Sequence, residues 1–107
     1  MKIERLENFT RGWVAGDFEP SIIRTKDFEV SVRDYKKGDK QPRHFHKVAK
    51  EVTIIVSGKF LINGQELIKG DCAILEPGEA ADFECLDDGS NTVIKTPSEI
   101  GDKYLAE

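Results

Sequence analysis

The apolar and polar positions of this chain alternate in short runs that indicate β-strands. Residues 28–33, FEVSVR, alternate with a period of two, which is the pattern of a strand with one buried face. Residues 52–56, VTIIV, are β-branched throughout and apolar on both faces, as in a central strand or one that packs against a second molecule. Helical spacing of apolar residues is confined to about one turn near residues 3–8.

A hairpin is predicted where Asn63-Gly64 separates the apolar runs 60–62 and 65–68. Both central residues of a type I′ turn need a positive φ, and Asn-Gly is the dipeptide that best tolerates it. Further short strands are expected at residues 71–75, 81–86 and 92–95, with turns at Gly70, at Pro77-Gly78 and at residues 87–89. Many short strands with glycine-rich turns predict an all-β barrel or jelly roll.

A chain of 107 residues is long enough for one domain with one core. We expect a single domain over residues 1–107, with the barrel core at about 28–96. Residues 10–25 are predicted to supply outer strands, and residues 97–107 an extended tail that lies on the barrel.

Charge and hydropathy exclude several classes of protein. The net charge of -4 argues against a nucleic-acid partner, because binding phosphates requires a basic face. No apolar stretch approaches the ~20 residues that span a bilayer, and the first residues lack the apolar segment of a secretory signal. We therefore expect a soluble cytoplasmic protein that has no membrane partner. Residues 33–50 form a basic segment, with seven Lys or Arg against Asp34 and Asp39.

The two histidines of the chain, His44 and His46, lie in this basic segment. On a strand, residues i and i+2 share a face, so both imidazoles point the same way. Residues 47–50 are enough for a turn that would bring Glu51, on a neighbouring antiparallel strand, close to His46. Two imidazoles and a carboxylate suit a first-row divalent ion, zinc included, although the pattern H-x-H-x4-E alone is weak.

The surroundings of these residues make the pattern specific. Gly38, His44, His46, Glu51 and Gly58 fill every fixed position of the first signature of the cupin family. The spacing from Gly70 to Gly78, with Asp71 and Pro77, is similar to the second signature. Over residues 30–86 the chain therefore resembles a cupin, a single-domain double-stranded β-helix or jelly-roll barrel. The resemblance implies a divalent transition metal (Fe, Mn, Ni or Zn) held by His44, His46 and Glu51.

The chain departs from the second signature at the fourth metal ligand. The last histidine of that signature falls on Ala81, and its closing asparagine falls on Cys85. An ion would then be held by three protein ligands, by water in the fourth position, or by a neighbouring carboxylate, Asp82 or Glu79. Strand parity places Asp82 on the face opposite Ala81, so Asp82 would need a bulge to reach inward.

The ligand is expected to be a small anionic or sugar-derived molecule. Arg11-Gly12-Trp13, residues 95–98 and residues 102–104 resemble parts of small cupins from bacterial sugar and surface-polysaccharide pathways. Lys40, Arg43 and Lys47 would attract a carboxylate or a nucleotide-sugar diphosphate toward the barrel mouth. The residues that we expect to line the pocket are Arg33, Tyr35, Arg43 and Phe83.

Three functions are compatible with these residues. In the first, the chain is a metal-dependent isomerase, epimerase or oxygenase with His44 and His46 in the catalytic centre. In the second, it is a metal-free nucleotide-sugar isomerase in which His44 or His46 acts as a general base. In the third, it binds a small ligand without chemistry. A homodimer is expected in each case, because small cupins commonly pair and residues 52–56 are apolar on both faces.

Overall fold

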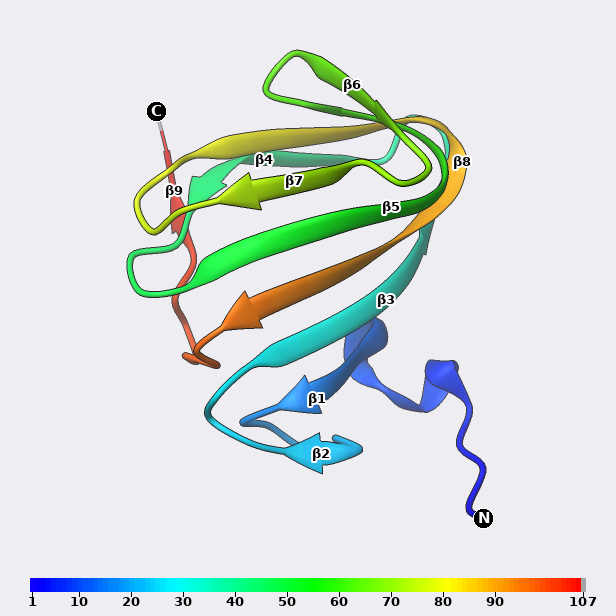
Figure 1. Cartoon of the computed structure of the whole chain (residues 1–107), viewed down its shortest axis with the longest axis vertical. Helices are drawn as coiled ribbons and strands as arrows, with labels where there is room; N and C mark the ends of the chain where they lie inside the picture. The colour runs from blue at the N-terminus through cyan, green and yellow to red at the C-terminus, as the bar shows by residue number, and fades with distance from the viewer. Residues whose placement is uncertain (107) are drawn as a thin grey trace.

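The computed structural model describes residues 1–106, and their regular secondary structure is almost entirely β-strand (Figure 1). The strands are β1 (Trp13–Gly16), β2 (Ile23–Arg24), β3 (Glu29–Tyr35), β4 (Lys40–Phe45), β5 (Lys50–Ile62), β6 (Gln65–Ile68), β7 (Cys72–Leu75), β8 (Ala81–Thr96) and β9 (Tyr104–Leu105). Two short 3-10 helices, η1 (Leu6–Asn8) and η2 (Thr10–Gly12), precede them. Within the described chain, no helix has the length and apolar character needed to cross a membrane.

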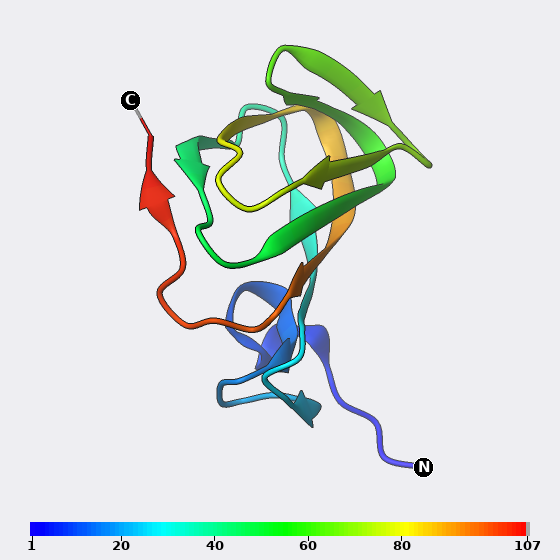
Figure 2. The same cartoon turned by 60° about the vertical axis from the view of Figure 1, so that its left-hand side comes forward.

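The long strand β8 organises the sheet. Along one edge it pairs antiparallel with β5, and along the other it pairs with β3 through residues 89–95 and with β4 through residues 81–84. Strand β5 also pairs with β6 and β7, and β1 extends the sheet beyond β3. Viewed after a 60° turn, the bent strands curl round into an open barrel (Figure 2). The predicted double-stranded β-helix is confirmed.

Strand β8 is continuous, so the prediction of two strands separated by a turn at residues 87–89 is wrong. Gly89 marks a close crossing of two strands: a Cβ there would lie 2.2 Å from the backbone oxygen of Ser57. The facing Gly58 has a φ of +80°, and the β5–β8 register shifts on both sides of Ser57 and again at Lys59. Bulges of this kind bend both strands sharply without interrupting them.

Aromatic side chains fill one side of the barrel interior. Tyr35, Ile55, Phe60 and Cys85 are buried, and Phe83 packs against them. The ring centroids of Tyr35 and Phe60 are 5.7 Å apart in an edge-to-face arrangement, and that of Phe83 lies 4.9 Å from Tyr35. Because Tyr35 and Phe83 also line the cavity described below, this cluster forms its inner wall.

The predicted hairpin turn is confirmed, and the C-terminal segment forms more structure than a tail. Asn63 and Gly64 both have positive φ, 49° and 75°, as a type I′ turn requires. Residues 97–107 were expected to lie extended on the barrel, and residue 107 lies outside the described residues. In the described part of this segment β9 joins the sheet, where it pairs antiparallel with β4 and aligns Leu105 with His44. This pairing brings the residues before β9 next to the histidines.

Candidate metal and ligand site

A cavity of about 430 Å³ opens inside the barrel. Its walls come from β3, β4, β5 and β8, from the N-terminal segment around η2, and from the segment before β9. Most of the residues that the sequence predicted for the site line this cavity: His44, His46, Glu51, Arg33, Tyr35, Phe83, Ala81 and Asp82. Arg43 is exposed, does not line the cavity, and donates to Oδ1 of Asn63 at 3.3 Å.

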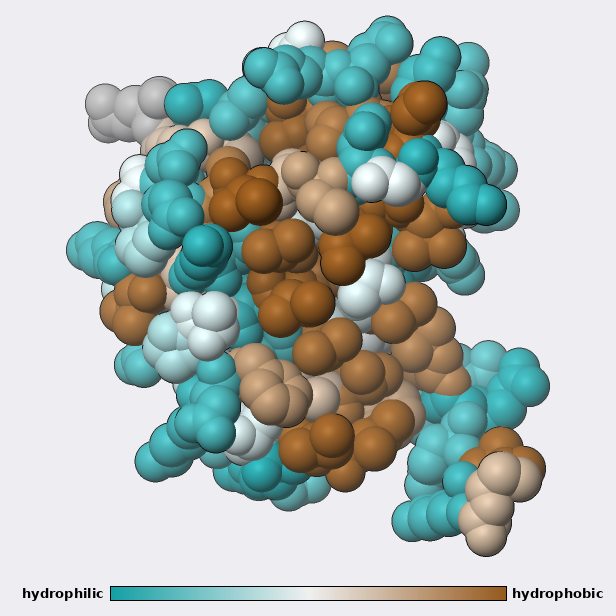
Figure 3. Space-filling view, in the orientation of Figure 1, coloured by the Kyte–Doolittle hydropathy of each residue, from teal (hydrophilic) through white to brown (hydrophobic). Residues whose placement is uncertain are grey.

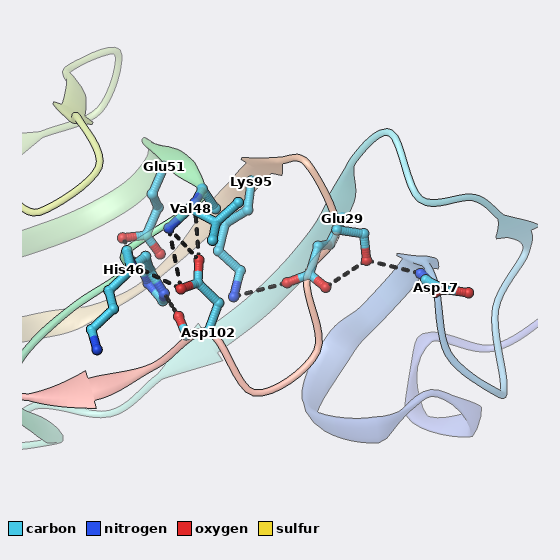
Figure 4. A network of polar contacts seen from close by, with 10 residues as sticks. Asp17, Glu29, His46, Val48, Glu51, Lys95 and Asp102 are labelled. Atoms are coloured by element: carbon cyan, nitrogen blue, oxygen red, sulfur yellow. Dashed lines mark hydrogen bonds and ion pairs between the residues drawn. The ribbon is translucent and has the colours of Figure 1, made fainter.

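His46 is held tightly at the end of β4. Its side chain is buried, and its Nδ1 donates a hydrogen bond to the backbone carbonyl of Asp102 (Figure 4). Its Nε2 lies 3.8 Å from Oε2 of Glu51 and has no hydrogen-bond partner in the described chain. A buried polar atom without a partner is rare and indicates a binding function or an unseen ligand.

His44 is fixed in the same way. Its Nδ1 lies 2.9 Å from the backbone carbonyl of Pro42, and its ring stands nearly perpendicular to that of His46, with centroids 5.5 Å apart. A ring nitrogen bonded to a carbonyl must carry the proton, so each Nε2 presents a lone pair when the ring is neutral. Burial lowers the pKa of His44, partly offset by the Pro42 hydrogen bond, and Lys103 lowers it further. The neutral form is the one that ligates metals.

Glu51 approaches His46 by a different route from the one predicted. We expected the two residues on neighbouring antiparallel strands, but β4 pairs with β8 and β9, and β5 pairs with β6, β7 and β8. The expected pairing of β4 with β5 is therefore wrong. Residues 46–49 instead connect strands on different sides of the barrel, so Glu51 faces His46 across the interior.

Asp102 fixes this connection and was missed by the sequence analysis. Its buried carboxylate accepts hydrogen bonds from the backbone N–H groups of Lys47 (2.8 Å), Val48 (3.1 Å) and Ala49 (2.9 Å) (Figure 4). Burial raises the pKa of Asp102, but the three donors together with His46 outweigh it, so that pKa lies below its ordinary value. One residue thus holds both the loop and, through its carbonyl, the ring of His46.

The donor chemistry of the site fits a divalent transition metal. Metal-bound histidines usually donate their second ring N–H to a carbonyl or carboxylate, as both histidines do here. The free Nε2 of His46 faces a carboxylate, which completes an N,N,O donor set. Among residues 1–106, however, no three His, Cys, Asp or Glu side chains are already drawn together into a coordination cage.

The position of the missing fourth ligand lies beside His44. Ala81 is buried and is the cross-strand partner of His44 in the β4–β8 pair. The irregularity in this pair lies on β4, between Gln41 and His44, so β8 shows no bulge here that would turn Asp82 toward the histidines. The carboxylate of Asp82 accepts a hydrogen bond from the backbone N–H of Asn63 at 3.0 Å, and the side chain is exposed.

The basic segment of the sequence mostly faces outward. Lys40 lies 4.0 Å from Glu84, and Lys47 lies over the ring of Tyr104 at 4.1 Å. Arg33 is the member that lines the cavity, with its guanidinium 4.9 Å from the centroid of Tyr35. Burial raises the pKa of Tyr35, and the charge of Arg33 opposes this rise.

The other basic residues of the cavity come from distant parts of the chain. Arg11, Lys95 and Lys103 line it, and none of them was assigned to the site from the sequence. Lys95 forms a buried ion pair of 2.8 Å with Glu29, which also accepts a hydrogen bond from Ser98 at 2.8 Å. The sequence placed these residues near its ends, and only the long-range pairings of β1, β3 and β9 bring them to the barrel.

Solved structures share this architecture. No protein-family model and no curated protein matches the sequence. A conserved protein of unknown function with a double-stranded β-helix domain, from Klebsiella pneumoniae, aligns over 100% of this chain and 98% of its own, with 22% identity and a TM-score of 0.72. An RmlC-like cupin from Shewanella frigidimarina aligns over 70% of each chain, with 22% identity and a TM-score of 0.65.

Enzymes also appear among the similar structures. The DMSP lyase DddQ from Ruegeria pomeroyi covers 88% of this chain and 49% of its own, with 20% identity and a TM-score of 0.72. The fold defines a small barrel of the cupin type, and the candidate site lies in a cavity inside it. The cupin resemblance of the sequence is thereby confirmed at the level of fold.

Proposed function

We propose that this protein is a metal-dependent enzyme that acts on a small organic molecule in the barrel cavity. The carrying observation is that both histidines donate Nδ1–H to backbone carbonyls, which leaves Nε2 of His46 buried, unpartnered and 3.8 Å from Glu51. Nε2 of His44, Nε2 of His46 and the carboxylate of Glu51 would hold the ion. A bound Fe, Mn, Ni or Zn ion would supply Lewis acidity toward a substrate oxygen for isomerisation or epimerisation, whereas oxygenation would need dioxygen as the oxidant and a redox-active ion such as Fe or Mn.

The remaining residues of the site orient these groups. The carbonyls of Pro42 and Asp102 fix the tautomer and direction of the two rings, so little order has to be gained when a ligand binds. The aromatic wall of Tyr35 and Phe83 excludes water from one side of the cavity. Ala81 leaves room beside His44 for water or for a second donor atom of the substrate.

A second candidate function uses the same atoms without metal. The unpartnered Nε2 of His46 can accept a proton from a substrate carbon beside a carbonyl group, and the facing Glu51 would stabilise the imidazolium that forms. In that case His46 is a general base and Glu51 is its charge partner. Binding of a ligand without chemistry is the third alternative.

Metal analysis separates these functions. Protein stripped with a chelator and reloaded separately with Fe(II), Mn(II), Ni(II) or Zn(II) is expected to retain about one ion per chain, measured by mass spectrometry of the metal. Glu51→Gln and the double variant His44→Ala, His46→Ala should lose it, whereas Glu66→Gln, an exposed glutamate on β6, should not. Wild-type protein that retains none of the four ions would overturn the metal-dependent function and leave the general base.

We also infer that the protein forms a homodimer through the outer face of its sheet. Outward-facing apolar residues form a row across four paired strands: Ile74, Val52, Ile94 and Val30. Figure 3 shows apolar side chains gathered over this face. Ile74 is 57% exposed and Val56 on β5 is 47% exposed, so the described chain leaves about half of each of these apolar side chains in contact with solvent. A second copy would bury this face.

A further inference from the structure

Three unpaired cations gather at the cavity. Arg11 from η2, Arg33 from β3 and Lys103 from the segment before β9 all line it. Within residues 1–106, none of the three has a carboxylate oxygen within 4.0 Å, whereas the fourth cation of the cavity, Lys95, is paired with Glu29. Cations that converge on a cavity without counterions indicate an anionic ligand.

The acidic residues of the same cavity are mostly occupied by other partners. Two of them form ion pairs with a lysine or arginine: Glu29 with Lys95, and Glu19 with Arg24 at 2.6 Å. Two accept hydrogen bonds from backbone N–H groups: Asp82 from Asn63, and Asp102 from three residues of the loop 47–49. Glu51 faces His46. The sixth, Glu99, is exposed and forms no ion pair with a described cation. The charge of Glu51 acts on Lys103, but none of the six acidic side chains forms an ion pair with any of the three cations.

The cations are close enough to repel one another. The pKa of Lys103 lies below its ordinary value, first because of burial and then because of the charges of Arg11 and Lys95; the charge of Glu51 opposes this shift, and that of Arg33 adds to it. Arg11 itself adopts a left-handed conformation, with φ 50° and ψ 35°, which is uncommon for a residue with a side chain. The next residue, Gly12, packs so tightly that a Cβ there would lie 2.0 Å from the carbonyl oxygen of Val32. The turn that carries Arg11 is thus fixed against β3.

Unpartnered polar atoms lie next to Arg33. Ser31 is two residues before Arg33 on the same face of β3. Asn91 on β8 is the cross-strand partner of Arg33. Ser31 and Asn91 are each 1% exposed and line the cavity, and neither Ser31 Oγ nor Asn91 Oδ1 has a hydrogen-bond partner in the described chain. An oxyanion that binds here would accept a hydrogen bond from the Ser31 hydroxyl, whereas Asn91 Oδ1 is an acceptor and would need a hydroxyl or N–H group of the ligand.

We propose that Arg11, Arg33 and Lys103 bind the carboxylate of a small organic acid, with Ser31 as a further donor. The planar guanidinium groups match a carboxylate, and apolar residues of the cavity such as Trp13 and Ile62 suit its carbon skeleton. A phosphate is less suited, because its sites usually add N–H groups of a helix N-terminus, and η2 has only three residues. The orientation of the acid toward His44, His46 and Glu51 rests on the proposed function, but the binding of its carboxylate does not.

Binding to chelator-treated protein tests the carboxylate site without any metal. Calorimetry at constant ionic strength would compare glycolate, pyruvate, malate and succinate with their neutral amides and with inorganic phosphate. At least one acid is expected to bind tenfold or more tightly than its amide and than phosphate. Failure of all four acids to exceed their amides would overturn the proposal, and preferential binding of phosphate would overturn the carboxylate assignment.

Variants locate the site. The pair Arg11→Gln, Lys103→Gln should weaken binding of the best acid at least tenfold, because it removes two charged donors. The matched double variant Arg43→Gln, Lys47→Gln removes two cations that lie outside the cavity. It should change the affinity for the best acid less than twofold. Equal losses in the two pairs would contradict the assignment. Arg11 and Lys103 are exposed, so the Arg11→Gln, Lys103→Gln variant should fold. It should also keep the metal content of the wild type. Loss of acid binding with unchanged metal content would therefore test the carboxylate site independently of the proposed metal site.

Discussion

The backbone carbonyl of Asp102 accepts the hydrogen bond from Nδ1 of His46, although 56 residues separate them in the sequence. The carboxylate of the same residue holds the backbone of residues 47–49, the loop that leads to Glu51. The C-terminal segment is therefore part of the site, because it sets the direction of one candidate ligand and the position of another.

Asp102→Asn should weaken both the fold and the site. The amide keeps one acceptor oxygen but loses the charge that binds three N–H donors, so we expect a loss of ~1–3 kcal/mol in the free energy of unfolding. Metal affinity should fall about tenfold or more because the loop before Glu51 loosens. Urea unfolding and metal titration measure the two effects. Asp34→Asn, at an exposed position, should change neither, and unchanged metal affinity in Asp102→Asn would refute the positioning role.

The stabilisation by Asp102 should depend on pH in a defined direction. Its pKa is lower in the folded protein than the value of about 3.9 expected in the unfolded chain. The carboxylate therefore contributes its full stabilisation above the unfolded pKa, and this contribution is lost as the pH falls through the folded pKa. The stability difference between wild type and Asp102→Asn should be constant from pH 5 to 7 and shrink below about pH 4. A difference that grows on acidification would show that another group dominates.

Gly89→Ala should be far more damaging than alanine at an open turn glycine. A Cβ at Gly89 would meet backbone atoms of Ser57 and Gly58 at 2.2 and 2.7 Å, and backbone at a strand crossing cannot move aside cheaply. We expect a loss of ~3 kcal/mol or failure to fold. A Cβ at Gly70 would meet no atom within 4 Å. Gly70→Ala should therefore lower the free energy of unfolding by only about 1 kcal/mol, because the residue has a positive φ. Similar melting temperatures for the two variants would contradict the close crossing.

The sequence predicted local features well and strand partners poorly. The period-two pattern and Asn63-Gly64 located strands and a turn, and the two histidines and Glu51 do line one cavity. Periodicity shows which face of a strand is buried, but it does not show which strand lies beside it, so the pairing of β4 with β5 was assigned wrongly. Gly89 was interpreted as a turn because a glycine at a backbone crossing has the same local signature. Asp102 entered the sequence analysis only as part of a resemblance, and its role could not be predicted because its donors lie more than 50 residues away.

Breaking the Glu29–Lys95 pair should be costly. Both side chains are largely buried, and Lys95→Met would leave Glu29 charged and without its ion-pair partner, so we expect a loss of ~3–5 kcal/mol. The double variant Glu29→Gln, Lys95→Met should recover much of this loss, because it also removes the unpaired charge. Lys50→Met, which breaks an exposed pair with Glu76 of 3.1 Å, should cost less than about 1 kcal/mol. Equal effects of the two lysine variants on urea unfolding would contradict burial of the first pair.

The homodimer inference predicts that one charge on the outer sheet face separates the protomers. Ile74 lies opposite Val52, which in turn lies opposite Ile94, so a lysine at position 74 places a charge at the exposed end of the apolar row. Sedimentation velocity at micromolar concentration should show a dimer for the wild type and a monomer for Ile74→Lys, with the fold retained because Ile74 is 57% exposed. Leu105→Lys, at a 74% exposed apolar residue on β9, should remain dimeric. A monomeric wild type would rule out the homodimer, and dissociation by Leu105→Lys alone would place its interface at β9 because the outer sheet face is unchanged in that variant.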